Sequence, residues 1–131
     1  TIYTLLTRWI PLGAYCLAIF LQSSGAAPDA LPAFPLADKL LHAVAYGLLA
    51  ILFFRAYRTI WPQRFSIAGL SILSATLYGA LDELHQSFVP ARSAEGFDLL
   101  ADFIGACAGM LLYWRYARRA DIRVDKKNRI G

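Results

Sequence analysis

The chain has 131 residues, 58% of them hydrophobic, and a formal net charge of +4 at pH 7. This length predicts one domain, and a mean hydropathy of +0.47 excludes an ordinary soluble protein of this size, so a membrane protein in contact with the lipid bilayer is expected. Because the basic residues lie at the ends of apolar segments and in the C-terminal tail, the positive charge indicates membrane orientation, and we expect no nucleic-acid partner.

The first apolar run, from Leu5 to Leu21, predicts a membrane-spanning helix over about residues 4–22. The small residues at 23–27 resemble a signal-peptide cleavage site, so a cleaved signal is the alternative interpretation. We favour a retained anchor. Three prolines between residues 28 and 35 predict an extended loop after this helix.

Three further apolar runs predict helices over about residues 38–57, 66–86 and 97–116. The charged tail, residues 118–131, is expected to fray. The sequence therefore predicts an all-α bundle of four transmembrane helices that forms one domain over residues 1–117.

The distribution of lysine and arginine predicts the orientation of this bundle. Four spans would place eleven of the thirteen basic residues on one side: Arg8, Arg55, Arg58, Arg64 and the seven from Arg115 onward. An excess of these residues marks the cytoplasmic side, so both termini and the tail are expected in the cytoplasm. Trp9, Trp61 and Trp114 map to the same interface, as in an aromatic belt. Lys39 and Arg92 map to the opposite, outer side with most of the acids.

The two cysteines, Cys16 and Cys107, both lie inside apolar runs. Neither has ligand-type residues at metal-binding spacing, so we interpret them as small buried hydrophobes. A disulfide between them is left open, because both would lie at a similar depth in the bilayer.

Ionisable residues concentrate between residues 82 and 102, where five of the nine acids lie between two apolar runs. Such groups are costly at membrane depth and mark functional sites. Polar positions that recur at helical spacing predict one patch on each of three helices. In chain order the patches are Asp38, Lys39, His42 and Tyr46; then Tyr78, Asp82, Glu83 and Gln86; then Asp98 and Asp102.

Some of these residues have ordinary structural interpretations. Asp38 would serve as a helix cap and Lys39 as an interfacial lysine. His42 is harder to explain in this way, because it lies inside a span and both of its ring nitrogens need partners. Gly105 and Gly109 follow the two aspartates on one face and predict close packing of the last helix against a neighbour.

Together with Arg92 from the loop, the three patches are expected to form one site at the outer side. This site would be an internal ion-pair network, a divalent cation site built from carboxylates, or a phosphate site using Lys39, His42 and Arg92. The excess of acids favours a cation or a paired network over a bare anion site. The candidate metal ligands are Asp82, Glu83, Asp98 and Asp102, and any catalysis would use His42 and Glu83.

Three segments resemble the VanZ-like family: DKLLHAVAY at 38–46, DELHQSFVPAR at 82–92 and DLLADFIGACAG at 98–109. The resemblance covers roughly residues 5–116, and three motifs in the same order make it specific. The matching positions are Asp38, Lys39, His42, Tyr46, Asp82, Glu83, Gln86, Pro90, Arg92, Asp98, Gly105 and Gly109. The chain departs from the family pattern at Ala91, where glycine is expected, and at Asp102, where asparagine is frequent. Asp102 adds a negative charge and leaves the charge balance of the site open.

The family is named after a small membrane protein associated with decreased susceptibility to teicoplanin. The resemblance therefore implies a multi-pass protein of the bacterial inner membrane whose outward-facing polar site binds a polar or anionic envelope ligand. A lipid-linked envelope precursor or a glycopeptide is the expected partner. The residues expected at the ligand are Asp38, Lys39, His42, Tyr46, Asp82, Glu83, Gln86, Arg92, Asp98 and Asp102.

Two other classes of function remain open. One is a membrane-embedded, metal-assisted hydrolase or transferase that acts on lipid-linked phosphates, with a divalent cation as its cofactor. The other is a purely structural charge network. The residue types in the site suit all three classes.

Overall fold

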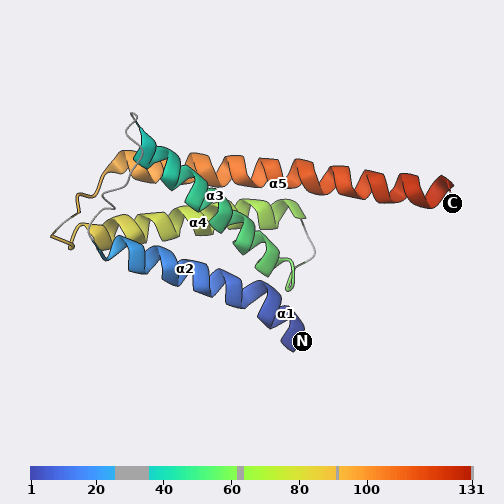
Figure 1. Cartoon of the computed structure of the whole chain (residues 1–131), viewed down its shortest axis with the longest axis horizontal. Coiled ribbons are helices and arrows are strands. Elements are labelled where there is room, and N and C mark those ends of the chain that lie inside the picture. The colour runs from blue at the N-terminus through green and yellow to red at the C-terminus, as the bar shows by residue number, and fades with distance from the viewer. Residues whose placement is uncertain (26–35, 62–63, 91, 131) are drawn as a thin grey trace.

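The computed structural model describes residues 1–25, 36–61, 64–90 and 92–130, including their side chains except those of Arg64 and residues 121–130. The described elements are all helical: α1 (Ile2–Thr4), the π-helical turn η1 (Leu5–Trp9), α2 (Ile10–Ser23), α3 (Ala37–Tyr57), α4 (Arg64–Gln86) and α5 (Gly96–Ile130). The first three run on from one another as a single helix (Figure 1).

Four helices are long and apolar enough to span a membrane: Ile2–Ser23, Ala37–Tyr57, Phe65–Gln86 and Gly96–Ala120. This confirms the expected all-α bundle of four spans. The start of α1 and the C-terminal part of α5 lie at one end of the bundle. The end of α2, the start of α3, the end of α4 and the start of α5 lie at the other end (Figure 1). We refer to the second end as the loop end.

Two helix ends differ from the expectation. Helix α5 continues to Ile130, whereas the tail was expected to fray from residue 118. Residues 110–130 contain no glycine and no proline, so none of them favours a helix end. At the start of α3, the N-cap is Leu36 in a left-handed conformation (φ 65°) instead of Asp38, which lies in the first helical turn.

Helices α3 and α5 approach most closely, through glycines. A Cβ atom on Gly109 would lie 2.6 Å from the carbonyl oxygen of Gly47, and one on Gly105 would collide with the backbone of Ala43. This confirms the close packing that the two glycines predict. The core beside this contact consists of Tyr46, Leu49, Ala50, Phe54, Ile67, Ala75, Ala106 and Met110.

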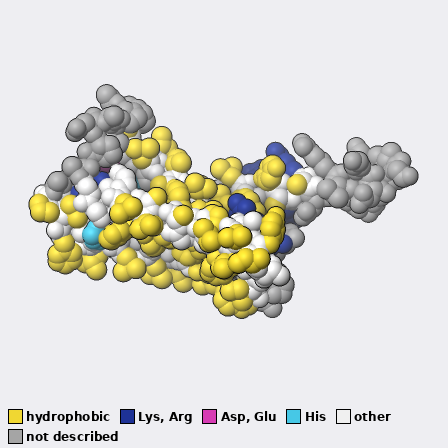
Figure 2. Space-filling view, turned by 60° about the horizontal axis from the view of Figure 1, so that its bottom comes forward, with side chains coloured by type: hydrophobic (Ala, Val, Ile, Leu, Met, Phe, Trp, Pro, Cys, Tyr) yellow, Lys and Arg dark blue, Asp and Glu magenta, His cyan; other side chains and the backbone are white. Residues whose placement is uncertain are grey.

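The outer surface of the bundle is largely apolar. Figure 2 shows hydrophobic side chains over most of the face in view. Large apolar residues are exposed on every helix, among them Leu17, Val44, Leu77 and Leu112. Such a surface suits contact with lipid chains, so the bundle is a multi-pass membrane protein.

The two cysteines, Cys16 and Cys107, are both free and half-buried. The disulfide left open by the sequence is therefore absent. Their half-buried positions in α2 and α5 agree with the interpretation as small hydrophobes.

Candidate functional site

Four carboxylates lie buried at the loop end of the bundle. The exposed fraction is 7% for Asp82, 9% for Glu83, 7% for Asp98 and 0% for Asp102. They come from α4 and α5, and α3 adds Lys39 and His42 beside them. The three helices thus bring their polar patches together, and the function of this group remains a prediction.

Lys39 is the centre of an ion-pair cluster. Its Nζ lies 2.8 Å from Asp38 Oδ2, 2.8 Å from Glu95 Oε2 and 2.5 Å from Asp98 Oδ1. An ammonium group has three N–H donors, and here each has a carboxylate acceptor. All three donors of Lys39 are therefore occupied within the protein.

His42 is oriented by Asp102. Its Nδ1 lies 2.9 Å from Asp102 Oδ1, whereas its Nε2 faces Asp98 Oδ2 at 3.8 Å. A carboxylate at Nδ1 keeps a proton on that nitrogen, so Nε2 of the neutral ring carries a free lone pair. The ring also stacks on Tyr46, with 6.1 Å between centroids and 5° between planes. The imidazole is thus held in one orientation with Nε2 available.

Asp82 connects α4 to α2. Ser23 Oγ donates to Asp82 Oδ1 at 2.5 Å, and Gln86 Nε2 donates to Asp82 Oδ2 at 2.9 Å. Ser23 is itself buried, with an exposed fraction of 1%. Both oxygens of Asp82 are engaged by neutral donors, and the expected role of Asp82 as a metal ligand stays a prediction.

Three buried oxygen atoms have no hydrogen-bond partner among the described residues: Tyr46 OH, Glu83 Oε1 and Asp102 Oδ2. Glu83 Oε2, by contrast, accepts from the backbone N–H of Glu95 at 2.9 Å. Buried polar atoms in proteins are nearly always paired. These three atoms, on α3, α4 and α5, are exceptions to that rule.

Arg92 does not contact the acidic cluster. Its Nε donates to the carbonyl of Gly25 and its Nη2 to the carbonyl of Gln22, both at 2.9 Å. Gln22 lies in the last turn of α2 and Gly25 just beyond it, where helical carbonyls lack partners. Arg92 thus binds the end of α2, and its expected contact with a ligand stays a prediction.

A cavity of about 470 Å³ lies between α2, α3 and α4 at the loop end. Its polar residues are Tyr15, Gln22, Asp38, His42, Tyr46, Asp82, Gln86 and Arg92. Its apolar residues are Ala18, Ile19, Leu41 and Ala45. The volume is typical of small-molecule sites, and the cavity combines a polar end with an apolar wall.

The ten residues expected at a ligand all lie at the loop end, but they divide into two groups. Asp38, His42, Tyr46, Asp82, Gln86 and Arg92 line the cavity. The remaining four, Lys39, Glu83, Asp98 and Asp102, are not among its lining residues.

Two participants were missed from the sequence. Glu95 precedes Asp98 by three residues and contacts Lys39, a proximity that its position in the acidic stretch indicated. Ser23 contacts Asp82, but a serine within a small-residue run carries no such signal.

The comparisons with known proteins agree with the three sequence motifs. An uncharacterized protein of Schizosaccharomyces pombe is 33% identical over 96 residues, which are 72% of this chain and 56% of that protein. The chain thus spans little more than half the length of this relative. No solved structure matches the chain. A family model described as VanZ/LLP1 matches residues 7–118, which include most of the first span, the whole second and third spans and the fourth up to Arg118. The chain therefore belongs to the VanZ/LLP1 family.

Proposed function

We propose that this VanZ-type membrane protein binds the headgroup of a lipid-linked cell-envelope precursor in the cavity between α2, α3 and α4. The observation that carries the proposal is the two-sided lining of the cavity, with Ile19 and Leu41 on its wall and His42 and Gln86 at its polar end. A lipid-linked molecule has an apolar chain and a polar headgroup, so its binding site needs an apolar wall and a polar end. A glycopeptide antibiotic is much larger than a drug-sized molecule, so a cavity of about 470 Å³ would not enclose it, whereas a single sugar or a short peptide of the precursor headgroup is of drug size or smaller.

The charges of the site indicate which part of the headgroup it would contact. The three N–H donors of Lys39 are engaged by carboxylates, and Arg92 donates two of its five N–H groups to backbone carbonyls. The carboxylates Asp38 and Asp82, which line the cavity, accept hydrogen bonds. Sugar hydroxyls, amides and amines donate them, so a glycan or peptide headgroup suits the polar end better than a bare anion.

The proposal also includes an orientation in which the site faces the outer side of the bacterial inner membrane. Support comes from the opposite end of the bundle, where Trp9 donates to Thr59 and Trp61 packs on Tyr57. This is the end with most of the lysine and arginine, which mark the cytoplasmic side. The bacterial assignment and a role in teicoplanin resistance rest on the family resemblance, because the matched relative is fungal.

Narrowing the cavity is expected to weaken precursor binding. Ile19 lines the cavity, whereas Leu17 on the same helix is exposed and does not. We expect Ile19→Trp to weaken binding of a polyprenyl-diphosphate-linked muramyl pentapeptide at least about tenfold, and Leu17→Trp to leave it within about twofold. The measurement is thermophoresis of the full chain in detergent.

Additional ligands in the same assay separate the alternatives. Polyprenyl phosphate without sugar is expected to bind more weakly than the full precursor, and teicoplanin not to bind. Equal effects of the two tryptophan variants, or a preference for teicoplanin over the precursor, would contradict the proposal.

The oriented imidazole favours a second candidate function, a hydrolase or transferase acting on lipid-linked phosphates. In that case His42 Nε2 would be the general base, held by Asp102. We expect His42→Gln to abolish any release of phosphate from polyprenyl diphosphate, while His85→Ala, which removes a ring contacting Ser24, retains it. A wild-type rate equal to that of detergent alone excludes this candidate.

A further inference from the structure

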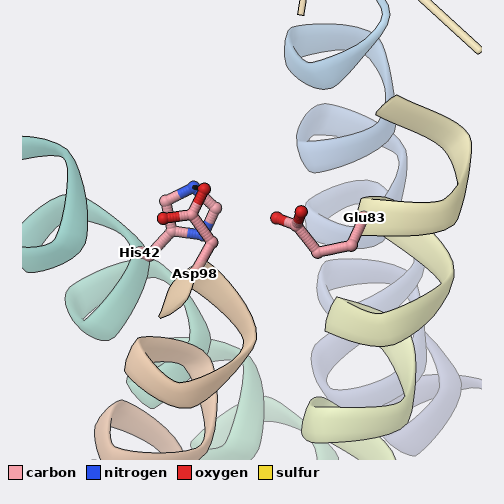
Figure 3. A group of neighbouring side chains, drawn as sticks. All are labelled: His42, Glu83 and Asp98. Carbon is pink, nitrogen blue, oxygen red and sulfur yellow. Dashed lines mark ion pairs between the residues drawn. The ribbon is translucent and has the colours of Figure 1, made fainter. Parts of the chain in front are cut away.

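Three side chains from three helices bring potential metal-ligating atoms within 4.8 Å of one another: His42 of α3, Glu83 of α4 and Asp98 of α5. Figure 3 shows the Glu83 carboxylate extending toward His42 and Asp98. We infer that these three residues bind one divalent transition-metal ion, with Asp102 as a positioning residue for His42. This inference goes beyond the proposed precursor binding and does not depend on it. It replaces the role of His42 as a general base, because a metal-bound Nε2 has no lone pair left to accept a proton.

The unpartnered oxygen of Glu83 is the first independent support. Glu83 is 9% exposed, and its Oε2 is engaged by the backbone N–H of Glu95, so Oε1 is the atom left without a partner. A buried carboxylate oxygen without a hydrogen bond or a counter-ion is strongly disfavoured. A cation between Glu83 and the other two residues would supply the missing interaction.

The charge of the surroundings is the second support. Six carboxylates cluster here around one ammonium group among the described residues: Asp38, Asp82, Glu83, Glu95, Asp98 and Asp102. Arg92, the other nearby basic residue, binds backbone carbonyls. Four of these acids, Asp82, Glu83, Asp98 and Asp102, are buried. Buried charges of one sign need compensation, and a single Lys39 does not supply it for four acids. A dication between His42, Glu83 and Asp98 would reduce this excess of negative charge.

In a neighbouring group of acids, the cation among the carboxylates is the ammonium group of Lys39. Asp38, Glu95 and Asp98 also bring oxygen atoms within 4.8 Å of one another. In this group, however, Lys39 Nζ contacts all three carboxylates. Asp98 belongs to both groups, with Oδ1 on Lys39 and Oδ2 facing His42. Of the two groups, the one with Lys39 already contains a cationic side chain. The group of His42, Glu83 and Asp98 contains no lysine or arginine.

His42 is oriented as metal-binding histidines are. Asp102 accepts at Nδ1, which directs the lone pair of Nε2 toward Asp98. A carboxylate on the distal nitrogen is the usual support of a metal-binding histidine. One imidazole nitrogen with two carboxylates suits Mn²⁺, Fe²⁺ or Zn²⁺ better than Ca²⁺ or Mg²⁺, which favour oxygen alone. Three protein ligands also leave coordination positions for water or a ligand oxygen.

The test is a titration of the full chain with Mn²⁺. The protein is purified in detergent, treated with a chelator and titrated with MnCl₂, while electron paramagnetic resonance measures free Mn²⁺. We expect one ion per chain and, in pulsed spectra, a nitrogen coupling from the imidazole. Glu83→Gln is expected to weaken binding by more than about tenfold, and Asp102→Asn by about 10- to 100-fold with the same stoichiometry.

Two matched variants serve as controls. Glu95→Gln removes a carboxylate that contacts Lys39 outside the inferred ligand set, and His85→Ala removes the other histidine. Both are expected to bind Mn²⁺ as the wild type does. Glu83→Gln keeps an oxygen for the N–H of Glu95, and a thermal unfolding curve in detergent verifies its fold.

Several results would overturn the inference. These are wild-type protein that takes up no stoichiometric Mn²⁺ or Zn²⁺, equal weakening by Glu95→Gln and Glu83→Gln, and a nitrogen coupling that persists in His42→Gln. In each case His42 would be assigned to the ion-pair network with Asp98 and Asp102. Loss of precursor binding with intact Mn²⁺ binding would contradict the proposed function and leave the metal site standing.

Discussion

Replacing Gly105 with alanine is expected to lower the free energy of unfolding by about 3 kcal/mol, the upper range for overpacking a close contact. The added Cβ would collide with the carbonyl oxygen and Cα of Ala43 and lie 2.6 Å from its carbonyl carbon. These are backbone atoms of α3, which cannot turn aside as a flexible side chain does. Helices α3 and α5 would have to separate.

The same separation is expected to disrupt the candidate site. Asp98 and Asp102 of α5 meet Lys39 and His42 of α3 across the helix contact that Gly105 permits. Their ion pairs and hydrogen bonds depend on distances of 2.5 and 2.9 Å, so a small shift of α5 breaks them. Gly105→Ala should therefore also weaken binding of Mn²⁺ and of the lipid-linked precursor.

The control for this prediction is Gly69→Ala, since a Cβ at Gly69 meets nothing within 4 Å. Its expected effect is small, within about 1 kcal/mol, the difference in helix propensity between the two residues. Thermal unfolding of both variants in the same detergent provides the comparison. If Gly105→Ala unfolds at the same temperature as Gly69→Ala, the tight contact between α3 and α5 does not determine stability.

The second large effect is expected for Lys39→Met, which removes the ammonium group from its three carboxylates. Breaking a buried ion pair by removing one partner costs about 3–5 kcal/mol, and partial exposure of the Lys39 side chain favours the lower value. Most of the loss is assigned to Asp98, because its side chain is 10% exposed whereas that of Glu95 is 51% exposed. Thermal unfolding in detergent measures it.

A double-mutant cycle tests this assignment. Adding Asp98→Asn to Lys39→Met should recover a substantial part of the lost stability, because the uncompensated buried charge is removed. Adding Glu95→Gln should recover less, since water solvates that carboxylate. A larger recovery with Glu95→Gln than with Asp98→Asn would show that the exposed pair dominates.

The sequence by itself determined the helices and the contact between the last helix and its neighbour. Apolar runs long enough to cross a bilayer are local signals, and the bilayer restricts such runs to helices. Gly105 and Gly109 indicated close packing because glycine has no side chain that would hold two helices apart. Helical spacing also placed Lys39, His42 and Asp98 on faces that meet.

Only the tertiary structure decided which partner each polar residue has. Asp82 binds Ser23 and Arg92 binds the end of α2, because the last turn of α2 offers polar atoms that compete with the acidic cluster. Asp82 and its partner Ser23 are 59 residues apart along the chain, and Arg92 is farther still from Gly25. Helical spacing in the sequence does not reveal contacts at such separations. Charge and spacing thus locate the site, whereas hydrogen-bond geometry between helices assigns the roles within it.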